Sequence, residues 1–185
     1  KTTEFLLGIV EKSATEGPRI TDITGTQPQA KLGQLVDTTM TTQFLARVVK
    51  ALPGKDPLHD RASAALDKCL AKLKSSQQQN GSWGKGGWAP VLQSSLGTSA
   101  LELAQVAGKN IDMDGLRRAR AYQKGNFNAK TGKVDASAGA GVALYSFAGA
   151  QRASAGEARA AQQLVAEAKK EGKLDPSAAV NVENL

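Results

Sequence analysis

The sequence predicts an all-α protein built from helical hairpins, and three observations carry this prediction. Apolar residues recur at helical spacing along most of the 185 residues, and capping residues, prolines and glycines mark the ends of the periodic stretches. Stretches of small or apolar residues alternate with amphipathic, charged stretches. Aromatic residues make up only 4% of the chain. We therefore expect helices that pack closely around small side chains.

The N-terminal part predicts one helix, a long connection and a second helix. The first helix spans 3–13, with Phe5 and Ile9 on its apolar face. The connection over 16–33 is rich in glycine and proline and reads as irregular. The second helix spans 35–52. It contains four threonines that are unfavourable in a helix interior and that tight packing would have to offset: Thr38, Thr39, Thr41 and Thr42.

A third helix is predicted over 57–76, with Asp56 as its cap and Pro57 at its first position. An apolar stripe at helical spacing predicts its buried face: Ala65, Leu66, Cys69, Leu70 and Leu73. The charged residues are expected on the opposite side: Arg61, Asp67, Lys68, Lys72 and Lys74. This pattern is typical of an amphipathic helix on the surface.

Two further helices follow a glycine-rich loop that carries both tryptophans. The loop spans 77–88, the fourth helix spans 94–107, and the fifth spans 112–123 with Asp112 as its cap. We interpret Asp112-Met113-Asp114 as this cap with a first-turn charge rather than as a metal site.

The C-terminal part predicts two more helices after a loop over 124–134 that has room for a short ribbon. A small-residue helix is expected over 137–152. The pattern Ser154-Ala155-Gly156-Glu157 predicts a capping box and a separate helix over 155–171, which ends at Gly172.

The alternation of helix types predicts a ring of hairpins with inner and outer helices. The small or apolar helices should be inner: 35–52, 94–107 and 137–152. The charged helices should be outer: 57–76, 112–123 and 155–171. A repeat supports this arrangement, because Phe127 follows Trp83 by 44 residues and both precede an inner helix.

The repeat has a motif, in which a glutamine at a helix end is followed by a glycine and an aromatic residue. The first copy has Leu73, Gln77, Gly81 and Trp83, and the second has Gln123, Gly125 and Phe127. A glutamine side chain can donate to the orphan carbonyls of a helix end and accept from a neighbouring helix start, and glycine permits a sharp turn. These residues are therefore expected to form a structural brace.

The first copy resembles the QW repeat of squalene–hopene and oxidosqualene cyclases. The repeated hairpins and the phrase Gly87-Trp88-Ala89-Pro90 are similar to bacterial proteins of the prenyltransferase/squalene-oxidase repeat family. The resemblance implies an α/α toroid, of which this chain would form about half. The domains expected are 1–33, an N-terminal helix with its connection, and 34–185, the hairpin-repeat domain.

No complete catalytic constellation occurs in the sequence. The Asp-rich motifs of cyclases and terpene synthases are absent, and His59 lies more than two turns from Cys69, so the two cannot meet on one zinc ion. Cys69 is expected to be a small core residue and His59 a solvated one. We expect no catalytic residue, no cofactor and no metal in this chain.

Two features have a possible binding role. The segment 115–133 carries six basic and no acidic residues near Tyr122 and Phe127, which is a pattern that can bind nucleic acid but is more often a solvated helix face. Trp88 is not required by the repeat and could line the mouth of the ring or pack under its loop. The candidate contact residues are Trp88, Arg117, Arg118, Arg120 and Lys124.

Three functions stay open. The first is a non-catalytic binding or assembly module completed by a protein partner or by a C-terminal half of its own, because the apolar ends near Phe5/Ile9 and 176–185 should be covered. The second is a fragment of a cyclase-like or prenyltransferase-like enzyme. The third is a basic nucleic-acid-binding protein, given the net charge of +7. No membrane span is expected, and both an exported protein without its signal and a cytoplasmic protein fit the sequence.

Overall fold

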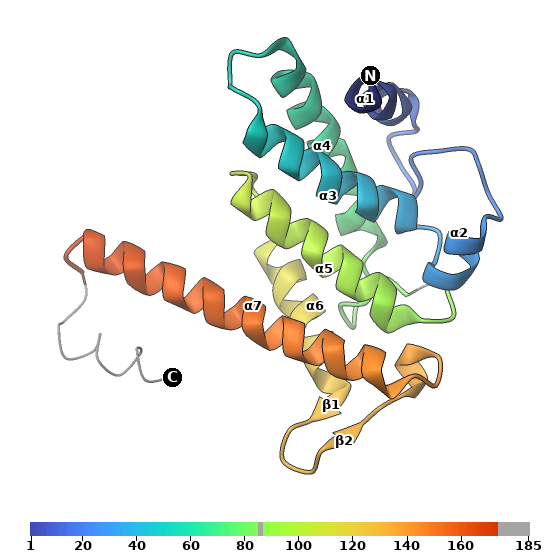
Figure 1. Ribbon diagram of the computed structural model, residues 1–185, viewed down its shortest axis with the longest axis vertical. Coiled ribbons are helices and arrows are strands. Elements are labelled where there is room, and N and C mark those ends of the chain that lie inside the picture. The colour runs from blue at the N-terminus through green and yellow to red at the C-terminus, as the bar shows by residue number, and fades with distance from the viewer. Residues whose placement is uncertain (85–86, 174–185) are drawn as a thin grey trace.

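The computed structural model describes residues 1–84 and 87–173, which contain seven α-helices and one short two-stranded ribbon (Figure 1). The helices are α1 (Thr2–Lys12), α2 (Gln27–Leu32), α3 (Val36–Ala51), α4 (Pro57–Ser76), α5 (Pro90–Val106), α6 (Met113–Gly125) and α7 (Ala143–Lys170). The all-α prediction is confirmed.

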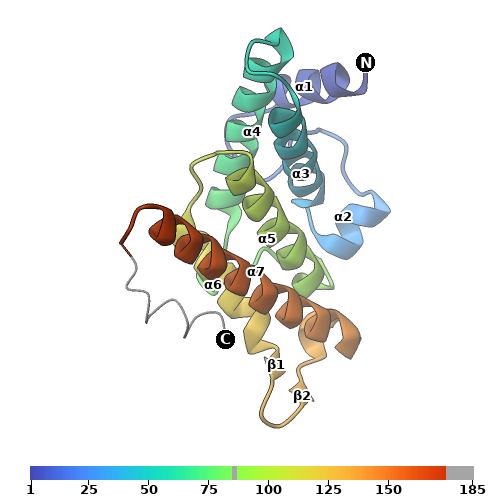
Figure 2. The same ribbon diagram turned by 60° about the vertical axis from the view of Figure 1, so that its left-hand side comes forward.

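Helices α3 and α5 pack side by side and run in the same direction (Figures 1 and 2). Helix α4 returns along α3, and α6 returns along α5. Helix α7 then crosses both α5 and α6, and one end of it extends beyond the rest of the molecule (Figure 1). The two hairpins α3–α4 and α5–α6 are thus formed as the alternation of helix types predicts.

The predicted start of α4 is confirmed by its cap. The Asp56 side chain accepts a hydrogen bond of 2.8 Å from the backbone N–H of Leu58, and Pro57 occupies the first turn. The threonines of α3 are buried; Thr39 and Thr42 donate to carbonyls of the preceding turn, whereas Thr38 donates to the carbonyl of Pro18 in the connection. Thr42 Oγ1 donates to the carbonyl of Thr38 at 2.7 Å, for example. This hydrogen bond removes the penalty of burying a hydroxyl and lets α3 pack on several sides.

The core has two parts. In the first, Leu7 and Val10 of α1 meet Leu45 of α3 and Leu66 of α4. In the second, Trp83 is surrounded by residues of α4, α5 and α6: Leu73, Ala100, Leu101, Leu116 and Ala119. The N-terminal helix therefore shares its core with the first hairpin.

Lys72 is buried, although its place in the helical pattern predicts a solvated position. Its ammonium donates to the carbonyls of Glu16 and Gly17 at 3.1 and 3.2 Å. Lys68 reaches the carbonyls of Glu11 and Ser13 in the same way. Two lysines of α4 thus hold the connection after α1. The helical pattern places Lys72 on the solvated side because the pattern contains no information about the loop that covers this residue.

The connection over 16–33 is not wholly irregular, because it contains α2. Thr26 caps this helix through a reciprocal capping box, in which its hydroxyl accepts from the Gln29 N–H at 3.4 Å and the Gln29 side chain accepts from the Thr26 N–H at 3.3 Å. Gln29 also donates to Asp37 of α3 at 2.7 Å, which ties α2 to the core. The high density of glycine and proline in the sequence obscured this short helix.

The prediction of separate helices over 137–152 and 155–171 is wrong. Residues 137–139 form a 3₁₀ turn, and α7 is one continuous helix of 28 residues, about 42 Å long. Ser154 does not cap a helix, because its hydroxyl donates to the carbonyl of Ala150 one turn earlier, at 3.1 Å. Gly156 lies inside the helix and is buried. The third hairpin is therefore absent from the described residues.

Smaller differences concern helix ends. Helix α5 begins at Pro90 rather than at position 94, and α6 continues to Gly125. The predicted ribbon is present: β1 (Phe127–Asn128) pairs antiparallel with β2 (Lys133–Val134), and Phe127 lies opposite Val134. Helix α5 can begin at Pro90 because a proline in the first turn of a helix costs no hydrogen bond.

At the N-terminal edge, Phe5 is 67% exposed, whereas Ile9 packs partly against the core. The other predicted edge, 176–185, lies outside the described residues. Among the helices that the structure describes, none combines the length and the apolar character needed to cross a membrane.

Candidate functional site

The strongest candidate site is a groove of about 350 Å³ between α3, α5 and α7, which we call the arginine groove. Helix α3 contributes Arg47, α6 contributes Arg120, and α7 contributes Arg152 and Arg159. Glu102 of α5 is the single acidic residue in the lining, so the lining carries a net charge of +3 at neutral pH. A concave surface with this charge favours an anionic ligand.

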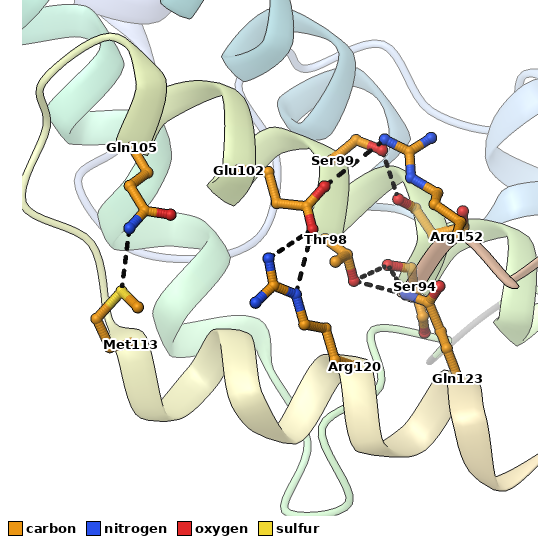
Figure 3. Close-up of polar contacts among 10 residues, drawn as sticks. Ser94, Thr98, Ser99, Glu102, Gln105, Met113, Arg120, Gln123 and Arg152 are labelled. Atoms are coloured by element: carbon orange, nitrogen blue, oxygen red, sulfur yellow. Dashed lines mark hydrogen bonds and ion pairs between the residues drawn. The ribbon is translucent and has the colours of Figure 1, made fainter. Parts of the chain in front are cut away.

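Glu102 lies between two arginines that approach it from different helices (Figure 3). Arg120 donates to Glu102 Oε1 from Nη2 at 2.8 Å and from Nε at 3.2 Å. Arg152 Nη2 lies 3.9 Å from the other carboxylate oxygen, Oε2. The side chain of Arg120 is only 9% exposed, whereas that of Arg152 is 46% exposed. Arg120 is therefore structural, and Arg152 is available to solvent.

Gly156 explains how α7 comes so close to this ion pair. A Cβ atom at this position would lie 2.4 Å from Glu102 Oε1 and 3.2 Å from Arg120 Nη2. The missing side chain lets α7 lie directly over the carboxylate, and this contact fixes the wall of the groove. Gly156, which the sequence suggests as part of a helix start, is a point of close packing between α7 and the Glu102–Arg120 ion pair.

A network of short polar side chains fixes α6 against α5 beneath the groove (Figure 3). Gln123 Nε2 donates to Thr98 Oγ1 at 2.6 Å and to the Ser94 carbonyl at 3.2 Å. Thr98 Oγ1 in turn donates to the Ser94 carbonyl at 2.9 Å. All three residues are buried. Buried hydrogen bonds of this kind hold the register of two helices, so they position Arg120 on α6 opposite Glu102 on α5.

The residues of the first predicted repeat form a brace between three helices. Trp83 is 3% exposed, and its indole N–H donates at 2.8 Å to the carbonyl of Leu73, one of the orphan acceptors at the end of α4. Gln77 Nε2 donates to Gly115 of α6 at 2.8 Å and to Gly81 at 3.1 Å. Gly81 adopts φ of +88°, and its Cα approaches the backbone of α6.

The second copy of the motif has a different geometry. Gln123 turns sideways to α5 rather than forward to a following helix, and Gly125 is still helical. Phe127 makes an edge-to-face contact with Phe147 of α7, with ring centroids 5.0 Å apart. The two copies therefore share residue types and spacing but not hydrogen-bond partners.

Most of the predicted contact residues have partners within the chain. Arg117 pairs with Asp114, Arg118 donates to Gln77 at 3.0 Å, and Lys124 pairs with Glu157 at 2.5 Å. Trp88 is 52% exposed and lines a shallow apolar pocket with Leu32, Leu92 and Tyr145. Of the predicted basic residues, only Arg120 reaches the arginine groove, where it is neutralised by Glu102.

Cys69 is completely buried in the first core cluster, and burial raises the pKa of its thiol to about 11. We expect the folded chain to react slowly at pH 8 with an aromatic disulfide reagent, because the thiolate is the reactive form. The denatured chain should react fully under the same conditions. The chain has one cysteine, so absorbance of the released thiol reports this site alone. Rapid stoichiometric reaction of the folded chain would contradict the burial of Cys69.

No group of three or more histidine, cysteine, aspartate or glutamate residues within 1–84 and 87–173 is placed to hold a metal ion. His59 is partly buried, and its Nδ1 lies 3.3 Å from Asp60 Oδ1.

Comparison with known proteins gives no match: no family model matches the chain, and neither does any curated protein or solved structure.

The arginine groove itself was not predicted from the sequence. Its residues come from four helices that are far apart in the sequence, α3, α5, α6 and α7, so no local motif marks it. One signal was available: Arg152 and Arg159 are seven residues apart and share a face of any continuous helix. The incorrect division of α7 into two helices concealed that relationship.

Proposed function

We propose that this chain is a non-catalytic binding or assembly module that holds a protein partner in the arginine groove. The observation that carries the proposal is that Arg47, Arg152 and Arg159 surround a groove whose single carboxylate is already bonded to Arg120. Positive charge in excess of the internal counter-ion favours an acidic partner. Exposed apolar residues on α7 support an assembly role in addition: Leu144, Tyr145, Phe147 and Leu164.

The scaffold that we propose is a part of an α/α toroid like that of the cyclase and prenyltransferase repeat proteins. Helices α3 and α5 lie beside one another with α4 and α6 behind them, and α7 crosses α5 on its open side (Figures 1 and 2), which supports inner and outer layers. The brace at Trp83 supports the resemblance to the QW repeat. In such a scaffold the arginine groove would face the centre of the ring.

The experiment is cross-linking capture from extracts of the cells that produce the chain. We expect a partner to be captured by the wild type and lost with the triple variant Arg47→Ala/Arg152→Ala/Arg159→Ala. The matched control is Arg117→Ala/Lys130→Ala/Lys133→Ala, which removes the same charge from exposed positions outside the groove. Equal capture by both variants would refute a binding function for the groove.

A further inference from the structure

The three available arginines of the groove keep most of their hydrogen-bond donors for a ligand. Among the residues that the structure describes, the one hydrogen-bond partner of the Arg47 side chain is the carbonyl of Gln43 in its own helix, at 3.3 Å. Arg152 makes a loose contact of 3.9 Å with Glu102. Arg159 is exposed and has no hydrogen bond or ion pair to any residue that the structure describes. A guanidinium group has five N–H donors, so each of the three can bind a carboxylate.

The floor of the groove is apolar as well as polar. Leu103 and Val106 of α5 lie between the arginines of α3 and those of α7, and Val106 is 52% exposed. Gln105 and Gln163 add exposed amides at the rim. The groove thus offers apolar contact along its base and positive charge on both walls.

The spacing of the arginines on α7 restricts the shape of the ligand. Arg152 and Arg159 are seven residues apart on one helix face, which is about 10.5 Å along the axis. A ligand helix returns to the same face after seven residues with the same rise. An extended ligand presents side chains on one face at about 6.6 or 13 Å, because its period is two residues. The spacing therefore matches a helix more closely than a strand.

We propose that the arginine groove binds an acidic amphipathic helix of a protein partner, and this inference rests on the proposed function above. Carboxylates seven residues apart pair with Arg152 and Arg159, a further carboxylate pairs with Arg47, and apolar side chains between them cover Leu103 and Val106. Recognition of a helix by a groove between helices is a common mode of peptide binding.

A nucleic acid fits the groove less well. No aromatic ring among the described lining residues is available to stack on a base. Leu103 and Val106 are complementary to leucine or isoleucine side chains and not to a sugar–phosphate chain.

The probe is a fluorescently labelled synthetic helix of three heptads, with glutamates seven residues apart and leucines on the adjoining positions. The control peptide has the same composition with the glutamates and leucines distributed around the helix. We expect the patterned peptide to bind in a fluorescence anisotropy titration, and the control peptide to bind more weakly. Equal binding of the two peptides, or no binding of the patterned one, would overturn the inference.

The protein variants test the location of binding. Arg152→Glu/Arg159→Glu should weaken binding of the patterned peptide about tenfold or more, because it replaces two attractions by two repulsions. Lys130→Glu/Lys133→Glu makes the same change of charge on the ribbon, at exposed positions outside the groove, and should leave the affinity within about twofold. Circular dichroism establishes that both variants are folded. Equal losses in the two variants would mean that net charge alone drives binding and would overturn the proposal.

A single-stranded oligonucleotide is included as a competitor. If it binds more tightly than the peptide and this binding is lost with the groove variant, the ligand is a nucleic acid and the helix inference is wrong. If the peptide fails but the triple variant of the capture experiment still loses its partner, the proposed function survives and only the identity of the bound element is wrong.

Discussion

Replacing Trp83 with alanine should lower the free energy of unfolding by about 3–5 kcal/mol, which is the range for removal of a large buried aromatic side chain. Trp83 is buried among residues of three helices, and its ring fills the space beside Gly97, where a Cβ atom would lie 2.5 Å from the indole. The substitution also leaves the Leu73 carbonyl without its hydrogen bond. Urea unfolding followed by far-ultraviolet circular dichroism measures the change.

The chain provides its own control, because Trp88 is the second tryptophan and is 52% exposed. Trp88→Ala should change the free energy of unfolding by about 1 kcal/mol or less. Trp83→Phe keeps most of the ring but removes the indole donor, so its effect should be intermediate. Similar losses for Trp83→Ala and Trp88→Ala would show that the brace does not hold the hairpins together.

Replacing Gly81 with alanine should be the second large perturbation. Gly81 has φ of +88°, and a Cβ atom there would lie 2.3 Å from the carbonyl oxygen of Arg118 in α6. The matched control is Gly108→Ala, at φ of +80° with no atom within 4 Å of the new Cβ. The backbone conformation alone costs about 1–2 kcal/mol at either position.

The clash at Gly81 should add about 2 kcal/mol or more to that cost, because the opposing atoms belong to a backbone that cannot move without displacing α6. Thermal unfolding of both variants gives the comparison. A Gly81→Ala variant as stable as Gly108→Ala would mean that the loop and α6 separate easily, contrary to the packing described above.

Helix ends were predictable where a single residue determines them chemically. Asp56 and Asp112 both accept hydrogen bonds from the first turns of their helices, as the sequence predicts. The pattern around Ser154 is chemically similar, but it does not act as a cap because α7 packs over Glu102 and Arg120 through Gly156. A local pattern cannot reveal that a glycine is required by a neighbour from another helix.

The brace was predictable and the groove was not, for a related reason. Gln77, Gly81 and Trp83 lie close together in the sequence, directly after the helix end that they complete. Arg47, Glu102 and Arg159 come together only through the packing of α3, α5 and α7. An arginine of the groove can bind a ligand only if Glu102 does not already neutralise it. Packing in the folded chain buries Arg120 beside Glu102 and so makes Arg120 the neutralised one.

The continuity of α7 means that one helix has two different local stabilities along its length. Up to Gly156 its buried residues are anchored in the core, whereas most residues from Arg159 onward are exposed. The distal turns can therefore open and close while the core stays folded. Arg159 lies at this transition, so binding of a partner to Arg159 would also order the distal turns, and the entropy lost in that ordering would lower the affinity. Binding at the groove would in this way be coupled to the helix–coil equilibrium of α7, and substitutions far from the groove along that helix would change the affinity without contacting the ligand.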